Sequence, residues 1–255
     1  MCLTAFKLKL IALASMFIDH IGAVFPEYFG LEFRVIGRLA FPIFVYLLAE
    51  GFRHTSNPHR FLVRLGVFAI ISEPFFDLAL RANLQAAEYI NMRFLWDNID
   101  FFANTNIFYT LFLGGVSICA IEHLKQSEKP PYSFKSLIAL VCVGAPFFVA
   151  EALTTDYAAY GVAFILLMYV ITDKKLRLAV MAVMCVWQHG DILQFIVEGH
   201  AGLLGLYNLM IPATLVTVLL AAFYNGKRGP GFKMMFYVAY PAHLAVLFMF
   251  RLIII

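Results

Sequence analysis

Charged residues are scarce in this sequence. Only 14% of its 255 residues are Asp, Glu, Lys or Arg, whereas 62% are hydrophobic and the mean hydropathy is +0.83. Soluble globular domains carry roughly 25% charged and about 45–50% apolar residues. A soluble core of this size could not bury so much apolar surface. The composition therefore excludes an ordinary soluble domain and indicates an integral membrane protein.

Cysteine and the common catalytic signatures are also sparse or missing. The four cysteines form no CxxC pair and have no metal-ligand spacing, so neither a disulfide framework nor a metal site is expected. The sequence contains no GxSxG, P-loop, HExxH or Rossmann fingerprint. The net charge is only +3, and the basic residues lie mostly in short loops. That distribution favours membrane orientation over a nucleic-acid partner.

Long apolar runs dominate the chain. A spanning helix needs about 20 mainly apolar residues, and we find nine candidates. The sequence thus predicts an all-α, polytopic bundle of about 9–10 spans in one membrane domain over residues 1–255. The nine runs are 8–25, 33–52, 61–80, 106–123, 136–152, 158–172, 176–188, 201–224 and 233–254.

The sequence makes separate predictions for the first apolar run and for the segment 81–105. The first run contains Asp and His, which a cleavable signal peptide would not tolerate, so we expect it to be retained as a helix. The segment 81–105 mixes charged and aromatic residues. That mixture suits an interfacial helix at the outer side of the membrane.

The basic residues predict the orientation of the chain. Lys and Arg are enriched on the cytoplasmic side of membrane proteins. With nine spans and a cytoplasmic N-terminus, fourteen of the 19 basic residues fall on the inner side. The inner segments are 7–9, 53–64, 125–135, 174–177 and 227–233. We therefore expect the N-terminus inside and the C-terminus outside.

Ionisable residues inside spans are costly and rarely face lipid, so each one is a functional hypothesis. Asp19 and His20 are adjacent and point about 100° apart around a helix. Arg34 and Arg38 are four residues apart and share a helix face. We expect Asp19 to pair with Arg34 or Arg38, leaving His20 to face a cavity. The alternative is that all four residues form a structural polar clasp.

Other polar residues are expected near the same outer level. Glu73, Asn106 and Thr110 lie in or at the ends of predicted spans. His243 lies near the middle of the last span, where Pro241 frees a backbone carbonyl. His243 could satisfy that carbonyl or face the cavity. This pattern is expected for a polar cavity within a helix bundle.

A second polar region lies on the inner side. Glu50 can meet Arg53 and His54 at spacings of three and four residues, and Arg60 follows. These side chains are either ordinary inner-side charge or a mouth that binds phosphate groups. The glycine-rich loop 225–231 holds Lys227 and Arg228 and could close over a phosphorylated ligand.

Several segments resemble the TraX family. They are MFIDHIGAVF (16–25), RVIGRLAFPIF (34–44), EGFRHT (50–55), NIFYTL (106–111), Asp156-Tyr157 with Gly161, YNGKRG (224–229) and YPAHL (240–244). Together they cover most of the chain, whereas residues 81–105 and 173–200 match nothing that we can place.

The resemblance implies a multi-pass acetyltransferase of the bacterial inner membrane. It would move an acetyl group from cytoplasmic acetyl-CoA to an acceptor at the outer face, with no metal. The name-giving member acetylates the N-terminal amine of F-pilin, and related enzymes modify envelope sugars. The acceptor could therefore be a pilin-like peptide, or a glycan or lipid of the cell envelope. An intramembrane histidine serves such transfers, and the motif carries that role to His20, with Asp19 beside it.

The expected chemistry agrees with this assignment. Neutral histidine is the natural base near pH 7, and fixed donors must stabilise the oxyanion. Arg38, Asn106 or a group on the last helix could be those donors, while the phosphates of CoA stay at the inner side. The residues expected to bind acetyl-CoA or the acceptor are Arg34, Arg38, Glu50, Arg53, His54, Arg60, Asn106, Thr110, Lys227, Arg228 and His243.

Two hypotheses of other classes remain. A proton-coupled transporter could use Asp19, His20 and Glu73 as a relay. The inverted repeats and paired broken helices typical of carriers are not evident in the sequence. A non-catalytic subunit for pilus or secretion assembly is the other possibility, and it predicts that His20→Ala leaves the phenotype intact.

Overall fold

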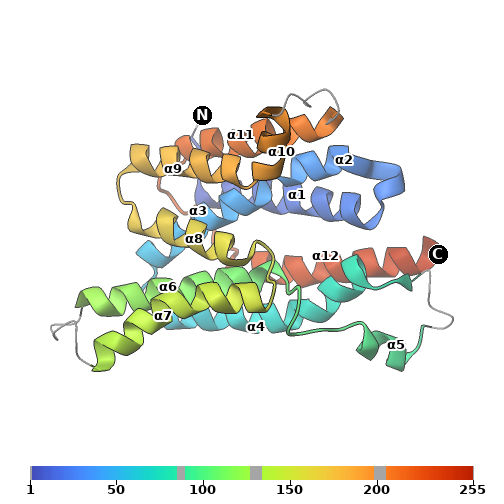
Figure 1. Cartoon of the computed structure of the whole chain (residues 1–255), viewed down its shortest axis with the longest axis horizontal. Helices are drawn as coiled ribbons and strands as arrows, with labels where there is room; N and C mark the ends of the chain where they lie inside the picture. The colour runs from blue at the N-terminus through green and yellow to red at the C-terminus, as the bar shows by residue number, and fades with distance from the viewer. Residues whose placement is uncertain (1, 85–89, 127–133, 198–204, 255) are drawn as a thin grey trace. The chain divides into compact units, whose positions relative to one another are not determined.

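The computed structural model describes residues 2–84, 90–126, 134–197 and 205–254. Helices make up most of these residues (Figure 1), and no strand occurs among them. The predicted all-α fold class is confirmed. Residues 85–89 and 127–133, which belong to the expected segments 81–105 and 125–135, lie outside the described residues.

The chain forms two compact units. The first unit comprises Met1–Leu47 and Ile171–Ile254, and the second comprises Leu48–Val170. The first unit contains α1 (Ala5–Val24), α2 (Pro26–Gly37), the start of α3 (Ala40–His54), α9 (Lys174–Trp187), α10 (Gly190–Val197), the 3₁₀ helix η4 (Gly205–Leu209), α11 (Met210–Ala222) and α12 (Lys233–Ile254). A single membrane domain over the whole chain stays a prediction.

The second unit holds the remaining helices. They are the end of α3, α4 (Pro58–Phe76), the π-helix η1 (Asp77–Arg81), α5 (Met92–Asp97), α6 (Ile107–Gln126), α7 (Phe134–Ala152) and α8 (Ala158–Val170). Small residues allow close packing between these helices. A Cβ atom at Gly114 would lie 2.6 Å from Ile165 Cδ1, so α6 and α8 are in close contact there.

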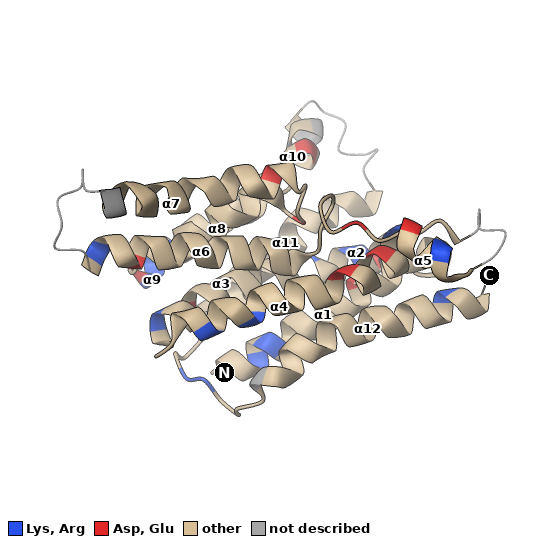
Figure 2. Ribbon diagram, turned by 90° about the horizontal axis from the view of Figure 1, so that it is seen from below, with Lys and Arg blue, Asp and Glu red and all other residues tan. Residues whose placement is uncertain are grey.

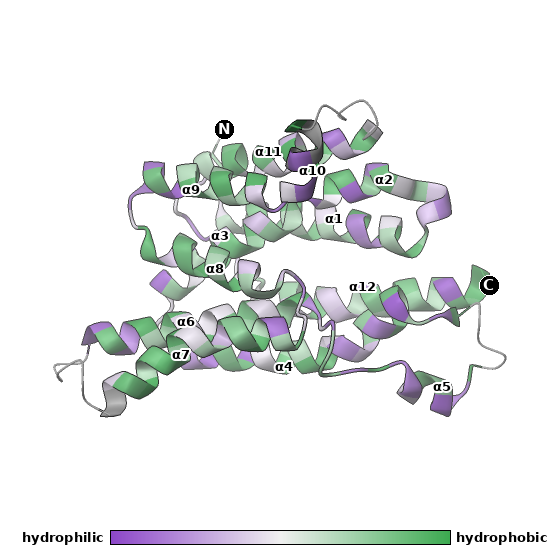
Figure 3. Cartoon of the chain, in the orientation of Figure 1, coloured by the Kyte–Doolittle hydropathy of each residue, from purple (hydrophilic) through white to green (hydrophobic). Residues whose placement is uncertain are grey.

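Hydrophobic residues are frequent along the helices, as the hydropathy colours show (Figure 3). Within the described residues, four helical stretches are long and apolar enough to cross a membrane: Pro26–His54, Ile107–Gln126, Gly205–Ala222 and Met234–Ile254. Two shorter apolar helices are Ser136–Ala152 and Ala158–Val170. These features are those of a membrane protein. The expected total of 9–10 spans and the cytoplasmic N-terminus stay predictions.

The expected span 33–52 lies within the apolar stretch Pro26–His54, but its backbone is divided between α2 and α3. The backbone N–H of Arg38 bonds to the carbonyl of Val35 at 3.2 Å, so the chain tightens as α2 ends. Pro42, in the first turn of α3, has no N–H to bond to the carbonyl of Arg38. A new helix therefore begins after Arg38 instead of continuing the old one.

The segment 81–105 is less helical than expected. Arg81 is the last residue of η1. Among the described residues that follow in this segment, the named helix is α5, over Met92–Asp97, and none of its residues is buried. Asn91 caps α5 by accepting from the N–H of Phe94 at 3.0 Å. An interfacial position for this short helix stays a prediction.

The start of α1 is anchored by the loop that precedes α12. The N–H groups of Ala5 and Phe6 donate to the carbonyls of Lys227 and Arg228 at 2.9 and 3.0 Å. Leu3 and Tyr224 form an isolated parallel bridge. The first N–H groups of a helix have no partner inside it, so this loop satisfies two of them for α1.

Charge is distributed unevenly along α4 in the second unit. Figure 2 shows basic residues toward its beginning and acidic residues toward its end. These are Arg60 and Arg64 near the beginning, and Glu73 and Asp77 at and just beyond the end. The two ends of α4 therefore offer different electrostatic environments.

Candidate functional site

Asp19 of α1 is held by two arginines in the first unit. Arg34 Nη1 contacts Asp19 Oδ2 at 2.5 Å, and Arg38 Nη2 contacts Asp19 Oδ1 at 2.7 Å. Arg38 Nε also donates to the carbonyl of Arg34 at 3.0 Å. The sequence predicted one such pair, and the structure contains both. With one carboxylate and two guanidinium groups, this cluster has a net charge of +1.

His20 faces a different neighbour. Its Nδ1 lies 2.6 Å from Nε2 of His243 on α12, and the two rings are nearly parallel with centroids 4.9 Å apart. His20 is buried. Asp19 thus points to α2 while His20 points to α12, as the 100° separation of adjacent helical residues predicts.

His243 is held on several sides. Its Nδ1 lies 2.9 Å from the carbonyl oxygen of Ala239, and the ring of Phe17 stacks on it with centroids 4.3 Å apart. Tyr240 presents an edge to it at 5.5 Å. The sequence left open whether His243 satisfies the carbonyl freed by Pro241 or faces a cavity. Its Nδ1 contacts the carbonyl of Ala239 and not that of Tyr237, which Pro241 frees, and His243 lines an apolar cavity.

The cavity lies against α1, α2 and α12 and has a volume of about 820 Å³. Its walls are almost entirely apolar and include Phe17, Ile21, Phe29 and Phe250. His243 is also in the wall, so the imidazole pair lies at the edge of an apolar space. This space is far larger than an acetyl group and suits an apolar part of a ligand.

A third buried histidine of the first unit was missed as a site residue. His189 follows α9, and its Nε2 lies 2.8 Å from the hydroxyl of Thr214, which donates to the carbonyl of Met210 at 2.7 Å. Thr214 and Thr217 lie one turn apart on the apolar helix α11. Hydroxyl groups in such a helix commonly bond to a neighbouring helix, and this signal could have identified a partner.

Asn106 belongs to a buried contact in the second unit. Its backbone N–H and its Nδ2 donate to Glu73 Oε2 at 3.0 and 2.5 Å, and Nδ2 also donates to the carbonyl of Ala69 at 2.8 Å. Glu73 and Asn106 are fully buried. The donors of Asn106 are therefore used to hold the carboxyl group of Glu73.

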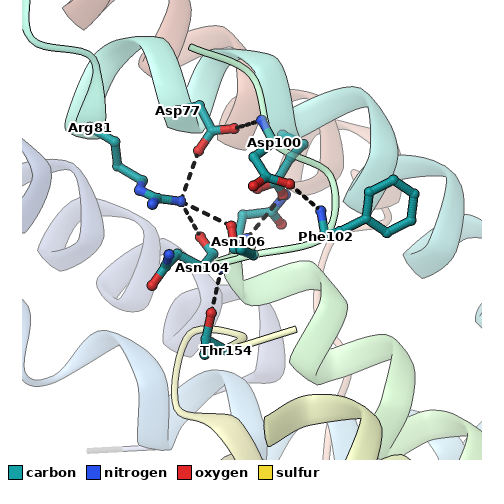
Figure 4. A network of polar contacts seen from close by, with 9 residues as sticks. Asp77, Arg81, Asp100, Phe102, Asn104, Asn106 and Thr154 are labelled. Carbon is teal, nitrogen blue, oxygen red and sulfur yellow. Dashed lines mark hydrogen bonds and ion pairs between the residues drawn. The ribbon is translucent and has the colours of Figure 1, made fainter. Parts of the chain in front are cut away.

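Asp77 and Arg81 organise the loop that leads to α6 (Figure 4). Arg81 Nη1 donates to Asp77 Oδ1 at 3.3 Å and to the carbonyls of Ala103 and Asn104 at 3.0 and 3.2 Å. The N–H of Asp100 donates to Asp77 Oδ2 at 2.8 Å. No role was predicted for Asp77. Its partner Arg81 is four residues away, but Asp100 is 23 residues away, and no local pattern indicates that contact.

Thr110 has a similar anchoring role. Its hydroxyl lies 2.9 Å from that of Thr155 and also donates to the carbonyl of Asp156. The N–H of Asp156 donates to the carbonyl of Thr105 at 2.9 Å. These contacts join the start of α6 to the turn between α7 and α8.

Glu50 pairs with both residues that the sequence indicated. Arg53 Nη1 lies 2.8 Å from Glu50 Oε1, and His54 Nε2 lies 3.7 Å from Glu50 Oε2. Arg53 Nη2 also donates to the carbonyls of Met168 and Tyr169 at 2.8 and 2.5 Å. The last carbonyls of a helix have no partner within it, so Arg53 caps α8.

The other basic residues of the predicted inner mouth are exposed. The side chain of His54 is 71% exposed, and Arg60 is exposed at the beginning of α4. Lys227 and Arg228 are also exposed, although their backbone carbonyls hold α1. Arg60, Lys227 and Arg228 thus present cations to the surroundings of the units in which they lie.

The predicted site residues fall into separate groups. In the first unit, Asp19, His20, Arg34, Arg38 and His243 form one cluster. Lys227 and Arg228 lie in the loop at the start of α1. In the second unit, one group contains Glu50, Arg53 and His54, while Asn106 and Thr110 lie in buried contacts near the start of α6. The described residues contain no group of three His, Cys, Asp or Glu side chains suited to a metal ion.

Comparison with known proteins identifies the family. The TraX protein family model matches residues 5–251. The chain is 28% identical over 252 residues to a protein of Dichelobacter nodosus described as "Probable fimbrial assembly protein FimC, serogroup H1", covering 96% of this chain and 94% of that protein. No solved structure matches the chain. The match over nearly the whole length agrees with the motifs found in the sequence, and the protein belongs to the TraX family.

Proposed function

We propose that this protein is a membrane acetyltransferase that moves an acetyl group from acetyl-CoA to an acceptor amine, with His20 as the base. The observation that carries this proposal is the cluster in the first unit. A buried histidine is paired with a second histidine, next to a carboxylate that two arginines already neutralise. Such a cluster of buried ionisable groups marks a functional site more often than a structural one.

In the proposed reaction, the acceptor nitrogen attacks the carbonyl carbon of the thioester. A C–N bond forms, the C–S bond breaks, and the acetyl group passes to the amine. His20 takes the proton that leaves the amine and returns it to the departing thiolate of CoA. Base and acid are thus the same imidazole, and no other reactant is required.

Neutral His20 is needed for the first step, and its surroundings favour the neutral form. His20 is buried, and Arg34 and Arg38 both contact the carboxylate of the adjacent Asp19. Because Asp19 balances only one of the two guanidinium charges, a further positive charge on His20 is disfavoured.

Arg34 is the proposed donor to the developing oxyanion. Only Nη1 of its guanidinium contacts Asp19, and its side chain is 35% exposed. We propose that its Nε and Nη2 donate to the ligand. A fixed cation near the thioester oxygen would stabilise the charge that forms there.

The phosphates of CoA are proposed to bind Lys227 and Arg228, two exposed cations of the first unit. Guanidinium and ammonium groups suit phosphate oxygens. Arg53 is a weaker candidate because its guanidinium already contacts Glu50 and the end of α8. We also propose that the protein lies in the bacterial inner membrane, because that membrane borders the cytoplasm, from which acetyl-CoA would come.

The acceptor is proposed to be the N-terminal amine of a pilin-like subunit. The name of the Dichelobacter nodosus relative, a probable fimbrial assembly protein, supports an acceptor of this class. The same name also favours a second candidate function, in which the protein assists pilus assembly without catalysis. An envelope glycan or lipid is a further acceptor class for the same chemistry.

The test uses purified protein in lipid nanodiscs with radiolabelled acetyl-CoA. Peptides with a free or a blocked N-terminal amine serve as acceptors, and released CoA thiol is measured with and without peptide. We expect acetylation of the free amine alone. If the wild-type protein neither binds acetyl-CoA nor releases CoA, the enzymatic proposal fails and the assembly role stands.

A further inference from the structure

The hydrogen bonds of His243 determine which of its nitrogens carries a proton. Nδ1 lies 2.9 Å from the carbonyl oxygen of Ala239. A carbonyl oxygen can only accept a hydrogen bond, so Nδ1 must be the donor and must carry the proton. In a neutral His243, Nε2 is then the unprotonated nitrogen and can only accept.

The same reasoning extends to His20. Its Nδ1 lies 2.6 Å from Nε2 of His243, which can only accept. Therefore Nδ1 of His20 must donate, and the proton of neutral His20 is on Nδ1. The remaining nitrogen, Nε2 of His20, keeps its lone pair.

If Nε2 of His243 instead donated to Nδ1 of His20, both nitrogens of His243 would carry a proton. That form adds a positive charge in a buried place, beside the cluster of Asp19, Arg34 and Arg38 with its net charge of +1. Burying an uncompensated charge is very costly. The neutral chain of donors, from His20 to His243 to Ala239, is therefore favoured.

We propose that His243 is a positioning residue that holds His20 as the Nδ1–H tautomer and so makes Nε2 of His20 the proton acceptor of the transfer reaction. This inference rests on the proposed function for its catalytic meaning. The geometry gives His243 little freedom, because Phe17 stacks on its ring and Ala239 fixes its Nδ1. A base whose tautomer is set by a second group is a general arrangement in enzymes.

The pair also has a role when the proton moves. As Nε2 of His20 takes the acceptor's proton, the ring becomes cationic and its Nδ1–H bond to His243 becomes charge-assisted. The bond is therefore stronger in the transition state than in the ground state. Interactions of that kind accelerate a reaction instead of merely tightening binding.

The direct test is ¹⁵N NMR of the full-length protein, labelled at histidine, in nanodiscs. A His20→Gln spectrum assigns the signals of His20. We expect a protonated Nδ1 and a bare Nε2 in the wild-type protein. A protonated Nε2 with a bare Nδ1 would overturn the inference. Because this measurement needs no substrate, it determines the tautomer of His20 whether or not the protein transfers acetyl groups.

Two variants test the part played by His243. His243→Phe keeps an aromatic ring against Phe17 but removes the acceptor, and His20 should shift toward the Nε2–H tautomer. His243→Gln keeps an acceptor near the position of Nε2 and should retain the Nδ1–H form. We expect kcat to fall on the order of 10²-fold in the Phe variant, with KM nearly unchanged and partial recovery in the Gln variant.

The spectra of these variants show whether His243 positions His20 or only supports the fold. If His243→Phe leaves the tautomer of His20 unchanged, His243 does not position it. If His243→Phe does not fold, the wild-type and His243→Gln spectra still decide the question, and a bare Nδ1 on His20 in either would contradict the inference. Wild-type protein with the expected tautomer but no acetyl transfer would instead count against the proposed function alone.

Discussion

Gly37 at the end of α2 lies directly against the carboxyl group of Asp19. A Cβ atom at position 37 would come within 2.0 Å of Asp19 Oδ1. Only a residue without a side chain fits there while Asp19 contacts both Arg34 and Arg38. The close approach of α1 and α2 thus sets the geometry of the charged cluster.

Gly37→Ala is expected to displace Asp19 from its two arginines. The added methyl group cannot be accommodated beside the carboxyl group, so the protein should unfold at a lower temperature and lose activity. Gly144→Ala is the matched control, because nothing lies within 4 Å of a Cβ atom at that helical position. It should be neutral or stabilise the protein by up to about 1 kcal/mol. Equal thermal stability of the two variants in detergent would contradict this packing.

The ion pairs of Asp19 should be energetically coupled. Asp19→Asn removes the carboxylate that both guanidinium groups contact, and loss of one partner of a largely buried pair costs about 3–5 kcal/mol. Arg38→Gln removes one of those cations, so the double variant should be less destabilised than the sum of the single variants. Thermal unfolding of the three variants measures the coupling. Strict additivity would show that Asp19 and Arg38 do not interact.

Asn106 is expected to support stability in the second unit. Asn106→Ala removes the side-chain donor to the buried Glu73 carboxyl group and the bond to Ala69. A buried polar group that loses its hydrogen-bond partner costs about 1–3 kcal/mol, so a loss of this order is expected. Glu73→Gln should be milder, since a neutral amide oxygen can still accept from Asn106. Greater damage from Glu73→Gln than from Asn106→Ala would contradict the assignment.

Lys227 and Arg228 are expected to bind the phosphates of CoA. Replacing both by Ala should raise KM for acetyl-CoA several-fold without lowering kcat, because their backbone carbonyls still hold α1. The KM for acetyl-pantetheine, which lacks the nucleotide phosphates, should not change. Lys175→Ala is the control, since this exposed lysine has no assigned role. An equal rise in KM for both donors would refute a phosphate contact.

Much of this architecture could be predicted from the sequence. The length and composition of the apolar runs located most helices, because a lipid environment demands continuous apolar helices. The cost of intramembrane charge singled out Asp19, His20, Arg34 and Arg38, and the structure places them close together. Helical geometry alone separated the directions of Asp19 and His20.

The rest depends on contacts that no local pattern reveals. His20 and His243 are 223 positions apart, so only the folded chain brings their rings together. The break between α2 and α3 lies within an apolar run. Hydrophobicity alone does not show that Pro42, which lacks a backbone N–H, favours the start of a new helix there. The spacing predicted the contact of Arg53 with Glu50, but not its contacts with the carbonyls of Met168 and Tyr169, which lie 115 and 116 positions away.

The central claim is that His20 is the base of acetyl transfer. Its most direct test is the rate of transfer by His20→Ala in nanodiscs, without and with added imidazole, compared with wild type and with His59→Ala at an exposed loop position. We expect His20→Ala to lose activity on the order of 10²-fold or more, imidazole to restore part of it, and His59→Ala to match wild type. Equal rates for His20→Ala and wild type would contradict the claim.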